Sequence, residues 1–298
     1  MEKTNQSVRH HYLPRHYLKG FTNEEGVFYV YDKNEEKIFR TSPSASFFEN
    51  NLNTISLPSG ESSVFLEDIY TSVENTSWPA LDRIRSSARE TNIELLDKMN
   101  LFYFLSFMYW RLPSRLTITE QLADRAFLQG DTFDFISLQS KNGTTPQEIV
   151  DLIKNSPSFR KIFRSIIPFA PFHKNTKWSD TLHNWRFLYT QSHENWYMVG
   201  DNPIITRVDN IQDPLKCLDE FVFPVSGNIL LVNKEPALAT SQSGDFILFY
   251  CFAVIERSTR FVACPNQEFL KTMVAAYKDL EPLKGQRTHA GEMFKAID

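Results

Sequence analysis

Glycine is scarce in this chain of 298 residues, which contains only ten. Loops that cradle phosphate groups need glycine, because the backbone must approach the ligand closely. Walker A, GxGxxG, GxSxG and HExxH motifs are all absent from the sequence. The chain therefore lacks the usual signatures of nucleotide-binding loops, of the serine-hydrolase elbow and of HExxH zinc sites.

Cysteine and long apolar runs are also in short supply. Cys217, Cys251 and Cys264 are odd in number, widely spaced and form no CxxC pair, which favours free buried thiols in a reducing compartment. The first nine residues are polar and lack an apolar signal core, and the longest apolar run, 246–255, has about half the length that spans a bilayer. We expect a soluble cytoplasmic protein with no membrane partner.

No excess of basic residues is present, since the formal net charge is −4. Broad electrostatic capture of nucleic acid is therefore not expected, and any such binding requires a local basic groove. Aromatic residues are abundant instead, with 25 Phe, 11 Tyr and 5 Trp. Because each aromatic side chain removes a large area from water, we expect a core built from interdigitated rings.

The hydrophobic pattern predicts strands near both ends of the chain and helices between them. Alternation and turn residues predict a hairpin at 27–31 and 37–40, and helical spacing predicts helices at 62–74 and 79–89. Residues 97–110 are apolar on nearly every side, which is typical of a buried central helix. The other expected elements are a short strand at 53–57, helices at 113–139, 146–155, 158–167, 241–256 and 268–277, and strands at 185–189, 196–199, 221–224, 228–232 and 260–264.

These elements predict an α+β fold. A helical subregion at 62–168 packs on a mixed or antiparallel sheet, which joins the N-terminal hairpin to the C-terminal strands. Residues 1–283 are expected to form one domain, and the polar residues 284–298 a loose tail. The sequence leaves the oligomeric state open.

The stretch from His11 to Phe21 carries the first group of candidate site residues. Pro14 fixes its own φ and favours extended backbone at the residue before it, so this segment is expected to be a rigid turn. Such a turn can hold the imidazole of His11 as a general base, with Arg15 and Tyr17 positioning a substrate. The alternative is that these side chains only pin the N-terminal segment to the sheet.

Acidic and basic candidates lie far along the chain. Asp201-Asn202-Pro203 follows a predicted strand, where a carboxylate can serve catalysis or simply close a turn. Glu74 lies near the end of a predicted helix and is either solvated or the second carboxylate of a metal site. Arg111 ends the central helix, where it either complements the helix dipole or holds a phosphate or carboxylate.

The order of these motifs resembles an uncharacterised bacterial family, domain of unknown function 4238 (DUF4238). The resemblance rests on His11-x-x-Pro14-x-x-Tyr17-Leu18-x-x-Phe21, on a helical glutamate at Glu74, on Arg111-x-Pro113, on Gly200-Asp201-Asn202-Pro203-Ile204 and on Phe223-Pro224-Val225-Ser226. The chain departs from the family's usual serine at Gly200, so any role of a hydroxyl there is lost. The resemblance supports the choice of residues and implies no established activity.

Our first hypothesis is a metal-dependent hydrolase, most plausibly a nuclease or phosphodiesterase of a bacterial defence or toxin type. Asp201 and Glu74 would hold a divalent metal such as Mg²⁺ or Mn²⁺, and His11 would activate water. Arg111, Arg15, Tyr17 and Asn202 would bind the substrate.

The second hypothesis is a non-enzymatic sensor or binding module with a polar pocket for a small anionic ligand or a partner. Arg15 and Arg111 without a poised pair of carboxylates would favour this alternative. In a third interpretation the motif residues only fix the fold.

Overall fold

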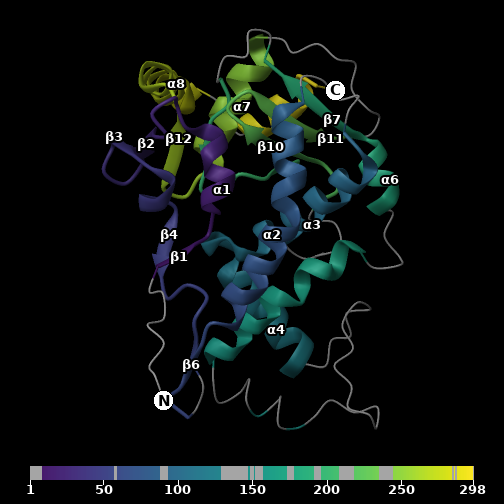
Figure 1. Ribbon diagram of the computed structural model, residues 1–298. Helices are drawn as coiled ribbons and strands as arrows, with labels where there is room; N and C mark the ends of the chain where they lie inside the picture. Colours follow the sequence, from purple (N-terminus) through teal and green to yellow (C-terminus); the bar gives the residue numbers. More distant parts are fainter. Residues whose placement is uncertain are drawn as a thin grey trace.

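The computed structural model describes residues 9–56, 59–87, 93–128, 147, 151, 157–172, 178–190, 196–207, 218–234, 244–283, 285 and 287–297. Within these ranges helices combine with antiparallel sheets, which confirms the predicted α+β class. The two larger sheets lie toward one end of the molecule, and helices from the middle of the chain extend toward the other end (Figure 1).

The first four-stranded sheet joins distant parts of the chain. Its order is β3-β2-β12-β8, and all of these pairs are antiparallel. β2 (Phe28–Asp32) and β3 (Lys37–Thr41) form the predicted hairpin, and β12 (Phe261–Cys264) lies between this hairpin and β8 (Val199–Gly200). Because an isolated hairpin is marginal in water, β12 supplies the neighbour that the hairpin requires.

The second four-stranded sheet, of order β7-β11-β10-β9, comes from the second half of the chain and is also antiparallel. The C-terminal strands are thus divided between two sheets. Pro224 lies inside one strand, where the register shifts, since proline cannot donate a ladder hydrogen bond. The strands are β7 (Trp185–Tyr189), β9 (Ile205–Thr206), β10 (Phe221–Ser226) and β11 (Ile229–Asn233).

Short elements surround the N-terminal segment. Two small antiparallel pairs are formed here, β1 with β4 and β5 with β6, and the predicted short strand at 53–57 corresponds to β5. These elements are β1 (Arg9–His11), α1 (Arg15–Leu18), η1 (Lys19–Phe21), η2 (Pro43–Ala45), β4 (Phe48–Asn50), β5 (Ile55–Ser56) and β6 (Ser62–Ser63).

The predicted central helix is α3 (Leu95–Arg111), whose residues from Leu101 onward are almost all buried. It packs along α2 (Phe65–Ser86), which is one continuous helix. The predicted division into helices at 62–74 and 79–89 is therefore wrong. Pro79 is exposed within α2, and a proline inside a helix costs about 3 kcal/mol. The apolar face of α2 outweighs this cost, because each fully buried Leu, Val or Ile side chain contributes about 1.5–3 kcal/mol.

The remaining helices of the middle region differ in part from expectation. α4 begins as predicted after a proline, but the prediction for 129–139 and most of the helix predicted at 146–155 lie outside the described residues. Short 3₁₀ turns continue across Pro168 and Pro171. These elements are η4 (Pro113–Arg115), α4 (Leu116–Leu128), η5 (Pro157–Ser165), η6 (Ile167–Phe172) and α6 (Trp178–His183).

The C-terminal helices pack together beside the first sheet. They are α7 (Gly244–Arg257), α8 (Gln267–Leu280), η8 (Glu281–Leu283) and α9 (His289–Lys295). The expectation of a loose tail over 284–298 is wrong for α9, which packs on α7 and buries Ala290, Met293 and Phe294. No helix in the described ranges is both long and apolar enough to cross a bilayer.

Arg85 fastens α2 to the N-terminal segment. Its Nη2 donates to the carbonyl oxygens of Tyr17 at 2.6 Å and Val225 at 2.9 Å, and its Nη1 donates to that of His16 at 3.1 Å. A Cβ on Gly20 would lie 2.3 Å from the same Nη2, so glycine leaves the space that this guanidinium fills. Burial lowers the pKa of Arg85 to about 10, which still leaves it charged at neutral pH.

The packing of α9 predicts that Phe294→Ala destabilises the protein strongly. Phe294 is 1% exposed, so the substitution should lower the free energy of unfolding by about 3–5 kcal/mol through lost burial and a residual cavity. Lys295→Ala, at the exposed next residue, should change it by less than about 0.5 kcal/mol. Denaturant unfolding measures both, and equal stability of the two variants would show that α9 does not belong to the core.

Candidate functional site

The segment around His11 is held in place by its backbone. In β1, His11 pairs with Phe48 of β4, and the two rings lie 5.6 Å apart. The next residue continues the connection, since the N–H of Tyr12 donates to the carbonyl oxygen of Phe47 at 3.0 Å. Pro14 then precedes α1 with extended backbone. The predicted rigid turn therefore exists and brings Arg15, four residues further along, next to the side chain of His11.

Arg111, at the end of α3, links three elements at this place. Its Nη1 donates to Oε1 of Glu74 on α2 at 2.5 Å, and its Nη2 donates to the carbonyl oxygen of His11 on β1. The guanidinium also lies over the ring of Tyr70, with 4.6 Å between its central carbon and the ring centroid. Arg111 is only 4% exposed, so these contacts fix a desolvated cation beside the N-terminal segment.

The facing surface of α2 carries side chains at helical spacing. Glu67, Tyr70, Glu74 and Trp78 recur at i, i+3, i+7 and i+11, which places them on one side of the helix toward β1 and α1. Trp78 stacks on His16 of α1, with 4.7 Å between the ring centroids. Because Trp78 lies beyond the helix predicted at 62–74, only a continuous α2 aligns all four residues.

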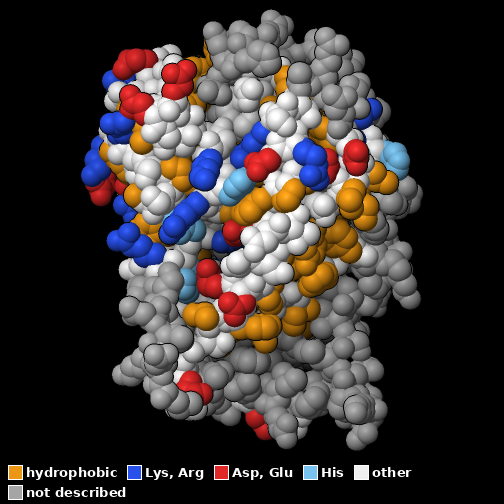
Figure 2. All heavy atoms as spheres, viewed as in Figure 1, with side chains coloured by type: hydrophobic (Ala, Val, Ile, Leu, Met, Phe, Trp, Pro, Cys, Tyr) orange, Lys and Arg blue, Asp and Glu red, His pale blue; other side chains and the backbone are white. Residues whose placement is uncertain are grey.

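Between β1, α1, α2 and the end of α3 lies a hollow of about 460 Å³, which we call the basic hollow. Four of its lining residues are Lys or Arg and two are Glu, and two histidines stand among them. In Figure 2 blue and pale blue side chains gather beside α1, next to the red side chains along α2. Its described lining residues are Arg9, His11, Pro14, Arg15, His16, Lys19, Glu67, Tyr70, Thr71, Glu74, Trp78 and Arg111.

His11 is neutral in this setting. Burial lowers the pKa of its imidazole to about 4, and the charges of Arg15 and Arg111 act in the same direction, while a backbone hydrogen bond at Ser44 and the charge of Glu67 oppose them. Nε of Arg15 lies 3.4 Å from Nε2 of His11 and donates to it. The acceptor nitrogen of this imidazole is thus engaged by Arg15, which is itself a lining residue of the basic hollow.

A second buried arginine, Arg164, contacts the end of α3 at Arg111. Arg164 donates through Nε to the carbonyl oxygen of Trp110 at 3.0 Å, through Nη2 to that of Arg111, and through Nη1 to Oδ1 of Asn53 at 3.0 Å. Asn53 in turn donates its side-chain amide to Glu67. The positive charge of Arg111 lowers the pKa of Arg164 further, although burial is the larger cause.

Several residues of the hollow were not predicted, namely Arg9, Lys19, Glu67, Tyr70 and Trp78. A signal for three of them was present in the sequence, because counting back and forward from Glu74 by helical spacing reaches Glu67, Tyr70 and Trp78. Glu67 and Tyr70 lie in the helix predicted at 62–74 together with Glu74, and only Trp78 was left out by predicting two helices in place of α2. Arg9 and Lys19 flank the His11 stretch, and nothing in their spacing indicates which way they face.

Asp201 does not join His11, Glu74, Arg15 and Arg111. Its carboxylate accepts three backbone N–H groups in the connection from α7 to β12, those of Thr259 at 2.7 Å, Arg260 at 2.6 Å and Phe261 at 3.0 Å. Burial raises the pKa of Asp201, against these hydrogen bonds. The residue lines a different cavity, of about 340 Å³. The structure therefore assigns Asp201 to an anchoring role, which corrects its predicted place in a shared site.

Tyr17 and Asn202 are also placed away from the basic hollow. Tyr17 is fully buried and donates its hydroxyl to the carbonyl oxygen of Pro224 at 2.7 Å, so it joins α1 to β10 and cannot bind a substrate. Asn202 is 9% exposed and is not among the described residues that line the hollow. The predicted substrate contact of Tyr17 is wrong because its side chain belongs to the interior. That of Asn202 stays a prediction, since its buried Oδ1 has no hydrogen-bond partner among the described residues.

The donor set does not fit the predicted Mg²⁺ or Mn²⁺ site. Magnesium and manganese prefer carboxylate oxygens that are free to coordinate, yet Glu74 is engaged by Arg111 and Asp201 by three N–H groups in another cavity. Among the residues that the structure describes, no group of three or more His, Cys, Asp or Glu side chains is arranged to hold a metal ion.

The fold and the hollow define an α+β protein whose N-terminal turn and two central helices enclose a cluster of cationic side chains. The chain belongs to the family described as protein of unknown function DUF4238, whose model matches residues 9–247. Neither the curated proteins nor the solved structures contain a match to it.

Gly200, where the chain departs from the family's usual serine, has a specific neighbour. A Cβ at this position would lie 2.0 Å from Oγ of Ser258, which donates to the carbonyl oxygen of Val254 at 2.6 Å. A hydroxyl from the end of α7 thus occupies the space beside Gly200, and any side chain at this position requires Ser258 to move.

The anchoring role of Asp201 predicts that Asp201→Asn destabilises the fold. An amide keeps one acceptor oxygen and turns an NH₂ group toward the N–H donors, so the free energy of unfolding should fall by about 1–3 kcal/mol. Asp279→Asn, at an exposed aspartate of α8, is the matched control and should leave stability nearly unchanged. Thermal and denaturant unfolding report the difference, and an unchanged Asp201→Asn variant would contradict the assignment.

Proposed function

We propose that this protein is a binding module that captures a small anionic ligand, bearing phosphate or carboxylate, in the basic hollow. The observation that carries the proposal is the fixed guanidinium of Arg111, surrounded by Arg9, Arg15 and Lys19 on the hollow's lining. Arginine presents a planar set of donors that matches carboxylate and phosphate oxygens.

Charge balance supports an anion. The positive residues on the lining outnumber Glu67 and Glu74, and Arg164 adds a second buried cation behind Arg111. Burial strengthens these fields, because charges interact more strongly where water is partly excluded. The net charge of −4 is thus compatible with a local cationic site.

Tyr70, one of the lining residues, has an unused hydroxyl donor. Its hydroxyl oxygen is buried, and among the described residues no hydrogen-bond partner lies within reach of it. A buried hydroxyl without a partner costs free energy, so a ligand oxygen at this place would recover that cost.

Binding is favoured over hydrolysis because the carboxylates of the hollow are already engaged. Glu74 balances Arg111, and Glu67 accepts the amide of Asn53. The two free carboxylates predicted to hold a metal do not lie together. Arg15 and Arg111 without such a pair of carboxylates are the arrangement for which the sequence favours a binding module. We infer a cytoplasmic setting, because Cys251 and Cys264 are free buried thiols.

Hydrolysis remains our second candidate, on one specific observation. His11 is a neutral imidazole at the rim of a cationic hollow, as a general base toward water would have to be. In this alternative Arg15 and Arg111 would stabilise charge on a phosphodiester, and the protein would act as a nuclease or phosphodiesterase in bacterial defence.

Anion binding predicts that Arg15→Gln weakens affinity. Arg15 is exposed at the rim, so its removal should spare the fold while raising the dissociation constant for phosphate or sulfate about tenfold, through loss of a charge-assisted contact. Calorimetric titration with inorganic phosphate, sulfate, citrate and nucleoside monophosphates gives the measurement. Arg287→Gln, at an exposed arginine that is not among the lining residues, serves as the control for a general loss of charge.

Glu74→Gln tests the charge balance of the basic hollow. If Glu74 only balances Arg111, its neutralisation should strengthen anion binding several-fold, since one negative charge leaves the hollow. Weaker anion binding in this variant, together with unchanged binding in Arg15→Gln, would contradict the proposed binding site.

Hydrolysis, if it occurs, should depend on His11. Incubation with RNA and DNA in the presence and absence of Mg²⁺ or Mn²⁺ should show cleavage that falls at least about 100-fold in His11→Gln and is unchanged in His183→Gln, at an exposed histidine of α6. Because the pKa of His11 is about 4, the imidazole stays neutral and the rate should be flat from pH 7 to pH 5. Absence of cleavage at any pH removes the hydrolase alternative.

A further inference from the structure

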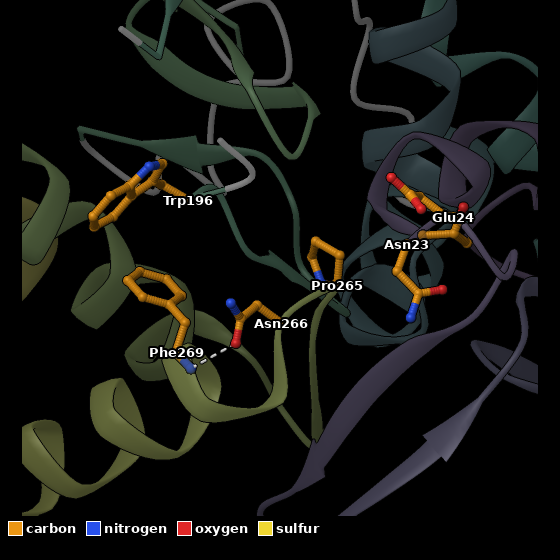
Figure 3. A pocket seen from close by; sticks show the side chains of 7 residues that line it. Asn23, Glu24, Trp196, Pro265, Asn266 and Phe269 are labelled. Carbon is orange, nitrogen blue, oxygen red and sulfur yellow. Dashed lines mark hydrogen bonds between the residues drawn. The ribbon is translucent and has the colours of Figure 1, made fainter. Parts of the chain in front are cut away.

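A second cavity, of about 630 Å³, lies between the turn that precedes β2 and the start of α8. Thr22, Asn23 and Glu24 line one side, Trp196 and Phe269 the other, and Pro265 and Asn266 lie between them (Figure 3). No Lys or Arg is among its described lining residues, so its chemistry differs from that of the basic hollow.

The aromatic side of this cavity is open to solvent. Trp196 is 38% exposed and meets the ring of Phe269 edge to face, with 5.4 Å between the centroids. An indole held in this way offers a flat apolar face at low entropic cost, because its neighbour limits the rotation of the side chain. Such a face suits the C–H surface of a flat ring.

The two asparagines can offer the cavity only donors. Oδ1 of Asn266 caps α8 by accepting the N–H of Phe269 at 3.0 Å, and Oδ1 of Asn23 accepts the N–H groups of Glu25 at 3.1 Å and Val27 at 3.2 Å. These contacts fix both amide orientations and leave the NH₂ groups without a partner among the described residues. In Figure 3 the amide nitrogen of Asn266 points away from the capped helix, into the space below Trp196.

Glu24 supplies the acceptor. It is exposed, and within the described part of the chain neither a hydrogen bond nor an ion pair engages its carboxylate. The cavity therefore combines one aromatic face, two fixed NH₂ donors and one carboxylate acceptor.

We propose that this cavity binds a neutral sugar ring. Sugar hydroxyls both accept hydrogen bonds, here from Asn23 and Asn266, and donate them, here to Glu24, while the C–H face of the ring lies on Trp196. A quaternary ammonium ion fits the indole and the carboxylate but has no acceptor for two fixed NH₂ groups. A phosphate would meet Glu24 with no cation to balance it. The proposal is independent of anion binding in the basic hollow.

Asn→Asp variants test this proposal sharply, because aspartate keeps the acceptor that caps α8 and removes the NH₂ donor. Saturation-transfer NMR of the full chain with glucose, galactose, mannose, N-acetylglucosamine and ribose should detect saturable binding of at least one sugar. Asn266→Asp should raise its dissociation constant roughly three- to tenfold, as expected for one lost neutral hydrogen bond, without lowering the melting temperature. Trp196→Ala should abolish binding.

Asn34→Asp, at an exposed asparagine of the β2–β3 turn, is the control and should bind the sugar normally. Choline and inorganic phosphate are the comparison ligands. The proposal is overturned if none of the sugars binds, if sugar binding persists unchanged in Trp196→Ala and Asn266→Asp, or if choline binds instead and binds more tightly to Asn266→Asp.

Discussion

The contact between Arg111 and its two partners determines where the candidate site lies. One guanidinium at the end of the central helix holds Glu74 of α2 and the backbone of His11 in β1, so two helices and a strand meet at a single buried charge. A buried cation must keep its partners, since leaving it unpaired costs several kcal/mol. This requirement places the N-terminal segment against α2 and α3. Arg85 of α2 makes a comparable contact, since it donates to the carbonyl oxygens of Tyr17 in α1 and Val225 in β10.

The sequence predicted the hairpin, the central helix and most C-terminal strands, because each has a clear period or a buried apolar run. It also selected four residues that meet in one hollow, namely His11, Arg15, Glu74 and Arg111. It misplaced Asp201 and Tyr17, since a carboxylate after a strand looks the same whether it faces a ligand or three backbone N–H groups of a distant loop. Such pairing depends on tertiary contacts. The prediction of a new helix at Pro79 was wrong for a related reason, because the packing of α2 overrides the local helix-breaking preference of proline.

Two cavities with opposite electrostatic character lie on one chain of modest net charge. The basic hollow concentrates arginine and lysine around a neutral histidine, while the described lining of the second cavity has a single carboxylate and no Lys or Arg. The net charge is a sum over the whole chain, so it does not indicate the local charge of either cavity. In both, the informative feature is which polar atoms already have partners. The engaged carboxylates of the hollow argue against a metal, and in the second cavity the engaged side-chain oxygens of Asn23 and Asn266 leave these two asparagines only donors for a ligand.

Strand β12 has a consequence for where this protein can be divided. The family model ends at residue 247, inside α7, yet β12 at 261–264 lies between the hairpin β2–β3 and β8 in the first sheet. A fragment cut at the family boundary would leave β2 and β8 with unpaired backbone edges, which are templates for aggregation. The region that the family model matches therefore ends before a strand of the first sheet, and we expect its expression to require the segment beyond residue 247.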